Sequence, residues 1–178
     1  MSKRLFMTLK QWMALGLMTA AAPFSAAAEL ALEVEIPRLQ VAEYHRPYVA
    51  IWIETDKGAH QQNLALWFDH DMDDNEGTKW LKDLRLWWRR SGREESFPVD
   101  GYAGATRPVG THRLTFSDQQ APLNALPPGQ YKLVVEAARE VGGREMIRLP
   151  FEWPINTPQN TSAEGEHELG HIQLNLNP

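Results

Sequence analysis

Alternating apolar and polar residues run along most of this chain, and they favour strands over helices. Leu30, Leu32, Val34 and Ile36 alternate with glutamates, which is the period of a strand with one buried face. This alternation, or a short apolar run, marks seven segments: residues 30–36, 48–54, 63–68, 111–116, 130–140, 144–153 and 171–176. Residues 48–54 (YVAIWIE) are apolar on both faces, which predicts a central strand. The chain is therefore expected to be all-β.

Proline and glycine turns separate these segments and indicate how they connect. Pro127-Pro128-Gly129 forms a firm turn, and Tyr131 follows it at the start of a strand. This arrangement resembles the tyrosine corner of immunoglobulin-like sandwiches. Gly142-Gly143 predicts a hairpin between residues 130–140 and 144–153. We therefore expect an immunoglobulin-like antiparallel β-sandwich.

One segment, residues 79–90 (KWLKDLRLWWRR), has the period of a helix instead. Trp80, Leu84, Trp87 and Trp88 fall on one face. Two arginines occupy the last turn, where cations suit the helix dipole, and Gly92 follows as a stop. We expect one short helical insertion, docked on the sandwich by its tryptophans.

The first 28 residues have the features of a secretory signal. They carry three of the 18 basic residues and none of the 23 acidic ones, with a short apolar run at 12–22. Ala26 and Ala28 form an A-x-A cleavage site, which places the mature start at Glu29. Residues 2–7 resemble a twin-arginine signal with lysine in place of the first arginine, so the export route stays open. An uncleaved membrane anchor is the weaker interpretation, because the apolar run is short for a span.

The rest of the chain is expected to form one domain with a tail. We assign residues 29–154 to the sandwich and residues 155–178 to a polar linker followed by a last strand. Residues 156–166 are rich in Asn, Thr, Pro, Gly and Ser, which predicts a mobile linker. No segment after the signal is apolar enough to cross a bilayer, so we expect a periplasmic protein without a membrane span.

Composition excludes several classes of chemistry. The chain has no cysteine, so disulfides, thiol chemistry, iron–sulfur clusters and cysteine-bound zinc are ruled out. Its net acidic charge argues against nucleic acid or an anionic membrane surface as partners. No Ser-His-Asp spacing, phosphate-binding P-loop or dinucleotide glycine run is present.

Two stretches resemble metal sites only superficially. Residues 69–77 (DHDMDDNEG) alternate aspartates like a calcium loop, but glycine is missing at the sixth position and Trp80 occupies the twelfth. Residues 167–171 match HExxH, which binds zinc only on a helix. Gly170 and the strand-like pattern after it argue against that helix. We interpret the first as a solvated loop and the second as a chance match, and we expect no metal.

The loop at residues 100–108 (DGYAGATRP) holds one hydroxyl, Thr106, among small residues. Gly104 and Ala105 leave the backbone beside the hydroxyl approachable. Arg107 offers a planar set of donors suited to a phosphate. For a generic Gly-Ala-Thr, a plain surface turn would be the better interpretation.

The spacing of Asp100, Gly104, Ala105 and Thr106 resembles the acceptor motif for covalent flavin attachment by FAD:protein FMN transferase. In such acceptors FMN is joined through its phosphate to the motif threonine. The resemblance implies that Thr106 is the covalent anchor for FMN, with Asp100 shaping the loop or contacting the transferase. We assign phosphate neutralisation to Arg107.

Other residues are candidates for the surroundings of the flavin. Trp87, Trp88 and Arg89 are weaker candidates for the ring environment, since core packing explains most of these side chains equally well. The polar cluster of His45 and Arg46 is less informative and is not assigned to the flavin. It precedes a central strand, where it either faces a phosphate or caps the end of the sheet.

Four stretches together (VEIPRLQVAEYHRPYVAIWIE, KWLKDLRLWWRRSGR, DGYAGATRPVGTHRLTF and PPGQYKLVVEAAREVGG) resemble a bacterial periplasmic family, the domain of unknown function 2271 family, up to about Pro154. Members of that family often occur with PepSY-type membrane proteins and with FMN transferase. The resemblance implies a periplasmic electron carrier with covalent FMN, rather than a catalyst, which relays electrons with a PepSY-type inner-membrane reductase. The alternative is a cofactor-free sandwich that binds a membrane protein or ligand.

Overall fold

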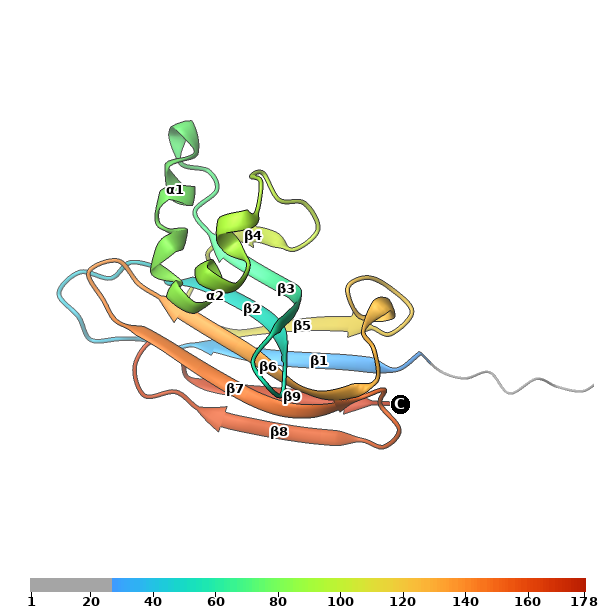
Figure 1. The fold of residues 1–178 in the computed structure, drawn as a ribbon. Helices are drawn as coiled ribbons and strands as arrows, with labels where there is room; N and C mark the ends of the chain where they lie inside the picture. The colour runs from blue at the N-terminus through green and yellow to red at the C-terminus, as the bar shows by residue number, and fades with distance from the viewer. Residues whose placement is uncertain (1–26) are drawn as a thin grey trace, which may run out of the picture.

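The protein is a sandwich of two β-sheets, seen in a computed structural model that describes residues 27–178. One sheet has four strands in the order β5-β1-β9-β8, and the other has five in the order β4-β3-β2-β6-β7 (Figure 1). The all-β sandwich predicted from the sequence is thus confirmed. The predicted signal segment lies outside the described residues except for its last two positions.

All seven predicted strands are present, with small shifts at their ends. The strands of the described chain are β1 Glu29–Ile36, β2 Tyr48–Thr55, β3 His60–Phe68, β4 Ala103–Ala105, β5 Gly110–Ser117, β6 Gly129–Ala138, β7 Arg144–Trp153, β8 Gln159–Glu164 and β9 His171–Asn177. The predicted glycine hairpin joins β6 to β7 in antiparallel register. The tyrosine corner is also confirmed, because the Tyr131 hydroxyl donates to the Pro127 carbonyl at 2.7 Å.

The main core lies between the two sheets, where the alternating apolar residues meet. The four apolar side chains of β1 are buried against those of β2, β6 and β9. A second core lies on the outer face of the five-stranded sheet, beneath the helical segment, and includes Trp52, Leu66 and Trp87. Strand β2 faces both cores, which explains why it is apolar on both faces.

The prediction of one continuous helix over residues 79–90 is wrong. Two short helices occur instead, α1 (Glu76–Lys79), which only reaches the start of the segment, and α2 (Arg85–Arg90), with a 3₁₀ turn at Leu81–Asp83 between them. Leu84 has angles that are neither helical nor extended, with ψ at 71°, and this breaks the helix. Further 3₁₀ turns lie at Asp73–Asn75, Gly92–Glu94 and Leu123–Ala125. Figure 1 shows α1 and α2 above the sheet that carries β2 and β3.

The prediction of a mobile linker at residues 156–166 is also wrong. Residues Gln159–Glu164 form β8, an edge strand paired with β9 in antiparallel register. Its residues alternate between exposed and half-buried, so the polar composition reflects an edge strand and not a linker. The HExxH stretch that follows enters β9 through a turn and is not helical, as expected.

The small-residue loop is only partly a loop. Residues Ala103–Ala105 form β4, a short strand that pairs in parallel with the end of β3. Within residues 27–178 no helix is long and apolar enough to cross a membrane.

Candidate functional site

Thr106 directly follows β4, so the pairing of this strand fixes where its side chain begins. Gly104 pairs with Trp67 and Ala105 with Phe68, both at the end of β3. The backbone amide of Leu66 also donates to the Tyr102 carbonyl at 2.9 Å. The segment before Thr106 is therefore held to the sheet by main-chain hydrogen bonds.

A buried polar network anchors the same segment through Tyr102. The Asn63 side-chain amide donates to the Tyr102 hydroxyl at 3.2 Å and to the Glu95 carboxylate at 3.0 Å. The indole of Trp87 donates to the carbonyl oxygen of Asn63 at 3.0 Å. Burial, and next the neighbouring Glu95, raises the pKa of the Tyr102 phenol, which stays protonated at physiological pH. This network joins β3, α2 and the strand that leads to Thr106.

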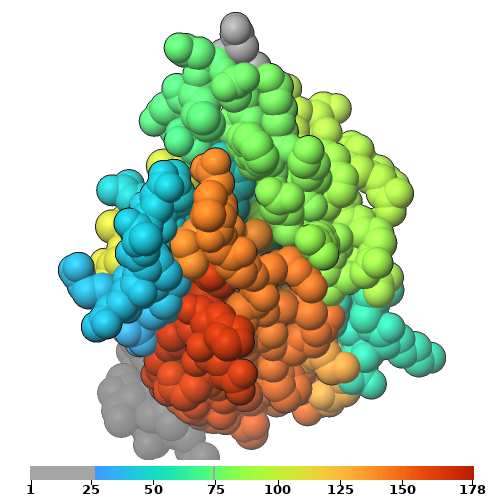
Figure 2. Space-filling view, turned by 90° about the vertical axis from the view of Figure 1, so that its left-hand side faces the viewer, coloured from blue at the N-terminus to red at the C-terminus, as the bar shows by residue number. Residues whose placement is uncertain are grey.

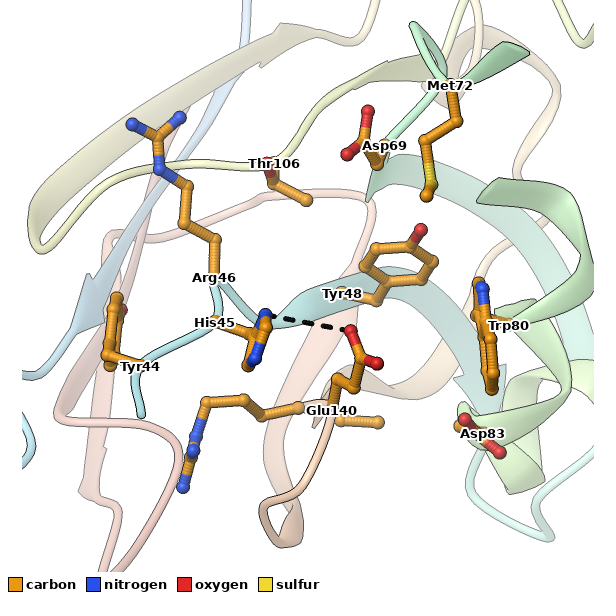
Figure 3. Close-up of a pocket in the computed structure, with 12 residues that line it drawn as sticks. Tyr44, His45, Arg46, Tyr48, Asp69, Met72, Trp80, Asp83, Thr106 and Glu140 are labelled. Carbon is orange, nitrogen blue, oxygen red and sulfur yellow. Dashed lines mark ion pairs between the residues drawn. The ribbon is translucent and has the colours of Figure 1, made fainter. Parts of the chain in front are cut away.

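Thr106 opens into a cleft of about 540 Å³ (Figure 3). The cleft is bordered by the loop before β2, the end of β3, the helical segment and the end of β6. Figure 2 shows this side of the molecule, where the blue loop, the green helical segment and the orange β6–β7 hairpin meet. The volume falls within the range of small-molecule sites, roughly 300–1,000 Å³.

Exposed apolar side chains gather at this cleft. Five large hydrophobic residues are exposed in the described part of the chain. Three of them, Tyr44, Met72 and Trp80, line the cleft, and a fourth, Val141, lines an adjoining groove of about 320 Å³. Trp80 borders both hollows. Such a concentration of exposed aromatic and thioether groups favours a binding surface over chance exposure.

Charged groups alternate around the rim. His45 lies 3.0 Å from the Glu43 carboxylate and 3.6 Å from that of Glu140. Arg46, in contrast, has no ion-pair partner among the side chains that the structure describes. In Figure 3 its side chain extends toward the segment that carries Thr106. The cleft is therefore lined both by a guanidinium without an ion-pair partner among the described side chains and by Thr106.

Below the rim, a buried ion pair supports the cleft. Arg139 and Glu168 are 6% and 4% exposed, and two hydrogen bonds of 2.8 and 3.1 Å join them. The same carboxylate accepts the Gly143 amide at 2.7 Å. Nη1 of Arg139 is buried and has no hydrogen-bond partner among the described residues. This pair joins the end of β6 to the turn before β9 and fixes one wall of the cleft.

The structure brings only one of the sequence-predicted flavin contacts into the cleft. Thr106 lines it, as do His45 and Arg46. Arg107 does not: its guanidinium lies over the Trp67 ring, 5.4 Å from the ring centroid. Asp100 lies exposed in a turn, and Ala105 is exposed at the end of β4. A side chain at Gly104 would meet no atom within 4 Å, so this edge is open to an approaching protein.

The tryptophans predicted for the ring environment lie elsewhere. Trp87 is fully buried in the second core and is tied to Asn63. Trp88 is half-buried and packs against the same core, with its ring centroid 6.4 Å from that of Trp87. Arg89 is exposed near the C-terminal end of α2. None of the three lines the cleft.

The sequence offered little signal for the residues that do line it. Trp80 was expected on the buried face of one helix, yet it is 45% exposed because the helix breaks on either side of it. Tyr48 was expected simply as a strand residue, and Met72 and Asp69 as parts of a solvated loop. The exposure of Trp80 becomes recognisable only once the breaks on either side of it are known. Among the described residues no three His, Asp or Glu side chains gather as metal ligands.

The chain was also compared with known proteins. A family model described as "Predicted periplasmic protein (DUF2271)" matches residues 29–171. Comparisons with curated proteins and with solved structures gave no match. The matched region begins where β1 begins and ends at the first residue of β9, so it includes the cleft and nearly the whole sandwich. The chain belongs to this family of predicted periplasmic proteins, the domain of unknown function 2271 family.

Proposed function

We propose that this protein is a periplasmic electron carrier with FMN attached covalently to Thr106. One observation supports the proposal above others: the threonine singled out by its motif lines the same cleft as the exposed side chains of Trp80 and Met72. A flavin needs a flat apolar seat for its ring and donors for its phosphate. The cleft offers both, next to the hydroxyl that would carry the cofactor.

The attachment is a phosphoryl transfer from FAD to Thr106, performed by FAD:protein FMN transferase. A bond forms between Oγ of Thr106 and the phosphorus of the FMN half of FAD. The pyrophosphate bond breaks, AMP leaves, and the hydroxyl proton passes to a base of the transferase. Thr106 is half-buried, while Ala105 and the Gly104 edge are open, so a second protein can reach this short segment.

After attachment, the flavin would supply the redox chemistry by accepting two electrons and a proton and later releasing them. The chain would anchor the phosphate, seat the ring and limit its contact with water. The electron donor is proposed to be a PepSY-type inner-membrane protein, and the acceptor an oxidant outside the cytoplasm. The protein then acts as a carrier, and no group of the chain itself needs to react during the relay.

The test is co-expression of the exported protein with and without the transferase. We expect a yellow protein that keeps its flavin fluorescence in a denaturing gel only when active transferase is present. Mass spectrometry should show one added FMN minus water on the peptide containing Thr106. Thr106→Ala should remove the added mass and leave the fold intact, because the Thr106 hydroxyl makes no hydrogen bond to the other described residues.

A matched control is Thr111→Ala, which removes an exposed threonine hydroxyl in β5. This variant should carry as much flavin as the unmodified sequence. A protein that stays colourless with active transferase would contradict the proposal and favour the cofactor-free binding module. Flavin retained by Thr106→Ala would contradict the attachment site.

A further inference from the structure

We infer that Trp80 and Arg46 seat the flavin in the cleft: the Trp80 indole packs against the ring and the Arg46 guanidinium pairs with the phosphate. This inference rests on the proposed function and assigns roles to two residues outside the flavin-acceptor motif. Both residues line the cleft together with Thr106, although they come from distant parts of the chain.

Trp80 has the features of a stacking platform. Large aromatic side chains are normally buried, but this indole is 45% exposed and borders both hollows of this face. Lys82 places its ammonium 5.9 Å from the ring centroid and is not itself a cleft residue, so the cleft side of the indole remains free. A flat, electron-poor ring gains by stacking on an exposed indole, because both apolar faces then leave water.

Other side chains complete the apolar wall. Tyr48 lies beside Trp80 in the cleft, and Met72 lies above Tyr48 in Figure 3. Burial raises the pKa of the Tyr48 phenol, and the Asp69 backbone offsets this rise only in part. Tyr48 therefore offers a neutral aromatic surface in the cleft, less exposed than Trp80.

Arg46 fits the phosphate better than Arg107 does. Arg107 is engaged with the Trp67 ring, whose side chain belongs to the core between the sheets, and it does not line the cleft. Arg46 lines the cleft and has no ion-pair partner among the described side chains. A phosphodiester on Thr106 would place one negative charge in the cleft that holds this unpaired guanidinium. Proximity in sequence to Thr106 suggested Arg107. The fold instead places Arg46 in the cleft, for which the sequence left a phosphate contact and a capping role open.

The ring contact is tested with the flavin-loaded protein by comparing Trp80→Phe with Trp88→Phe. Both changes replace a tryptophan with a smaller aromatic residue. Trp88 is the control, because it does not line the cleft. Indole in contact with flavin quenches its fluorescence by donating an electron, and phenylalanine does not. We expect Trp80→Phe to raise the fluorescence several-fold, toward that of urea-unfolded protein, and Trp88→Phe to leave it unchanged.

A second measurement of the same contact is the melting temperature with and without flavin. A seated ring stabilises the folded state, so attachment should raise the melting temperature of the unmodified sequence. That rise should be lost in Trp80→Ala. Equal rises in the two proteins, or unchanged fluorescence in Trp80→Phe, would overturn the role of Trp80.

The phosphate contact is tested with Arg46→Gln and Arg107→Gln, which remove one charge each. Phosphorus NMR of the loaded protein reads the environment of the phosphodiester directly. We expect the resonance to shift in Arg46→Gln and to stay in place in Arg107→Gln. A shift caused only by Arg107→Gln would overturn the assignment.

Failure of this inference can be told apart from failure of the proposed function. If the unmodified sequence never acquires flavin, the proposed function falls and this inference falls with it. If flavin attaches at Thr106 but neither Trp80 nor Arg46 affects its fluorescence or phosphorus resonance, only the seat assigned here is wrong.

Discussion

Gly77 shows how one missing side chain lets two elements approach. It is buried within α1, and a Cβ at this position would collide with the backbone carbonyl of Asp69. Asp69 follows directly after β3 and lines the cleft, so the glycine lets the helical segment settle on the end of that strand. The glycine is needed for space and not for an unusual backbone angle, since its φ is not positive.

We therefore expect Gly77→Ala to lower the free energy of unfolding by about 1–3 kcal/mol, the usual cost of overpacking. The measurement is urea unfolding followed by tryptophan fluorescence. Gly104→Ala is the matched control: its Cβ would meet nothing within 4 Å, so its effect should stay within about 0.5 kcal/mol. Equal stabilities of the two variants would contradict the close contact with Asp69.

At the scale of elements, α2 depends on a strand for its cap. The helix has no capping side chain of its own, and its first turn carries no acidic residue. Glu136 of β6 accepts the amides of Leu86 and Trp87 at 3.0 and 2.8 Å, the second and third residues of the helix. Arg144 of β7 adds a 2.8 Å ion pair to the same carboxylate. This fully buried glutamate thus fixes where the helix begins.

Removing this cap should be costly. We expect Glu136→Ala to destabilise the protein by about 3 kcal/mol, because two amides and a guanidinium lose a buried charged acceptor. Arg144→Ala should cost only about 1 kcal/mol, since that side chain is 39% exposed and water can replace it. Thermal unfolding and near-ultraviolet circular dichroism of the tryptophans would measure both. A smaller loss in Glu136→Ala than in Arg144→Ala would contradict this cap.

A side chain of strand β8 also satisfies backbone groups of another strand, β7. The side-chain amide of Gln159 bonds both backbone groups of Glu152 on β7, at 2.8 and 2.9 Å. It thereby satisfies main-chain groups on the outer edge of β7, where no further strand pairs. A polar residue that composition assigns to a linker thus connects the edges of the two sheets.

In the whole molecule, the two sheets are joined by carboxylates at the end that carries the cleft. Glu145 of β7 accepts four backbone amides, from Glu166 to Leu169, at 2.6 to 3.0 Å. These amides belong to the turn before β9, in the other sheet. The same turn carries Glu168, which pairs with Arg139 beneath the cleft. The stretch that resembles HExxH is therefore a structural tie between sheets.

This tie predicts how stability depends on pH. Burial raises the pKa of Glu145, but the four amide hydrogen bonds together outweigh it and lower the pKa below the ordinary 4.5. A lowered folded-state pKa means that the stabilisation is present above the ordinary value of 4.5 and is lost as pH falls through the lowered value. Glu145→Gln should therefore be less stable than the unmodified sequence at pH 7. The difference should shrink below about pH 4. Unfolding in urea across this range measures it, and a difference independent of pH would contradict the argument.

Much of the fold could be predicted because alternation and turn chemistry are local. The alternating residues of β1 and the glycine hairpin after β6 carry their own signals, and both were placed correctly. The broken helix could not be predicted, because Glu136, 50 residues from Leu86, decides where α2 begins. Strand β8 was missed because an edge strand stays polar on its outer side and is thus locally indistinguishable from a linker.

The candidate site, like the fold, could be predicted from the sequence only in part. The sequence by itself determined the all-β class, the family, and Thr106 as the residue on which the proposed function depends, since these rest on local pattern and motif. Only the tertiary structure decided which side chains surround that threonine. It turned Arg107 onto Trp67 and brought Arg46 and an exposed Trp80 into the cleft. The reason is physical: a cleft is built where separate elements end, and the distances between those ends are set by packing of the two cores.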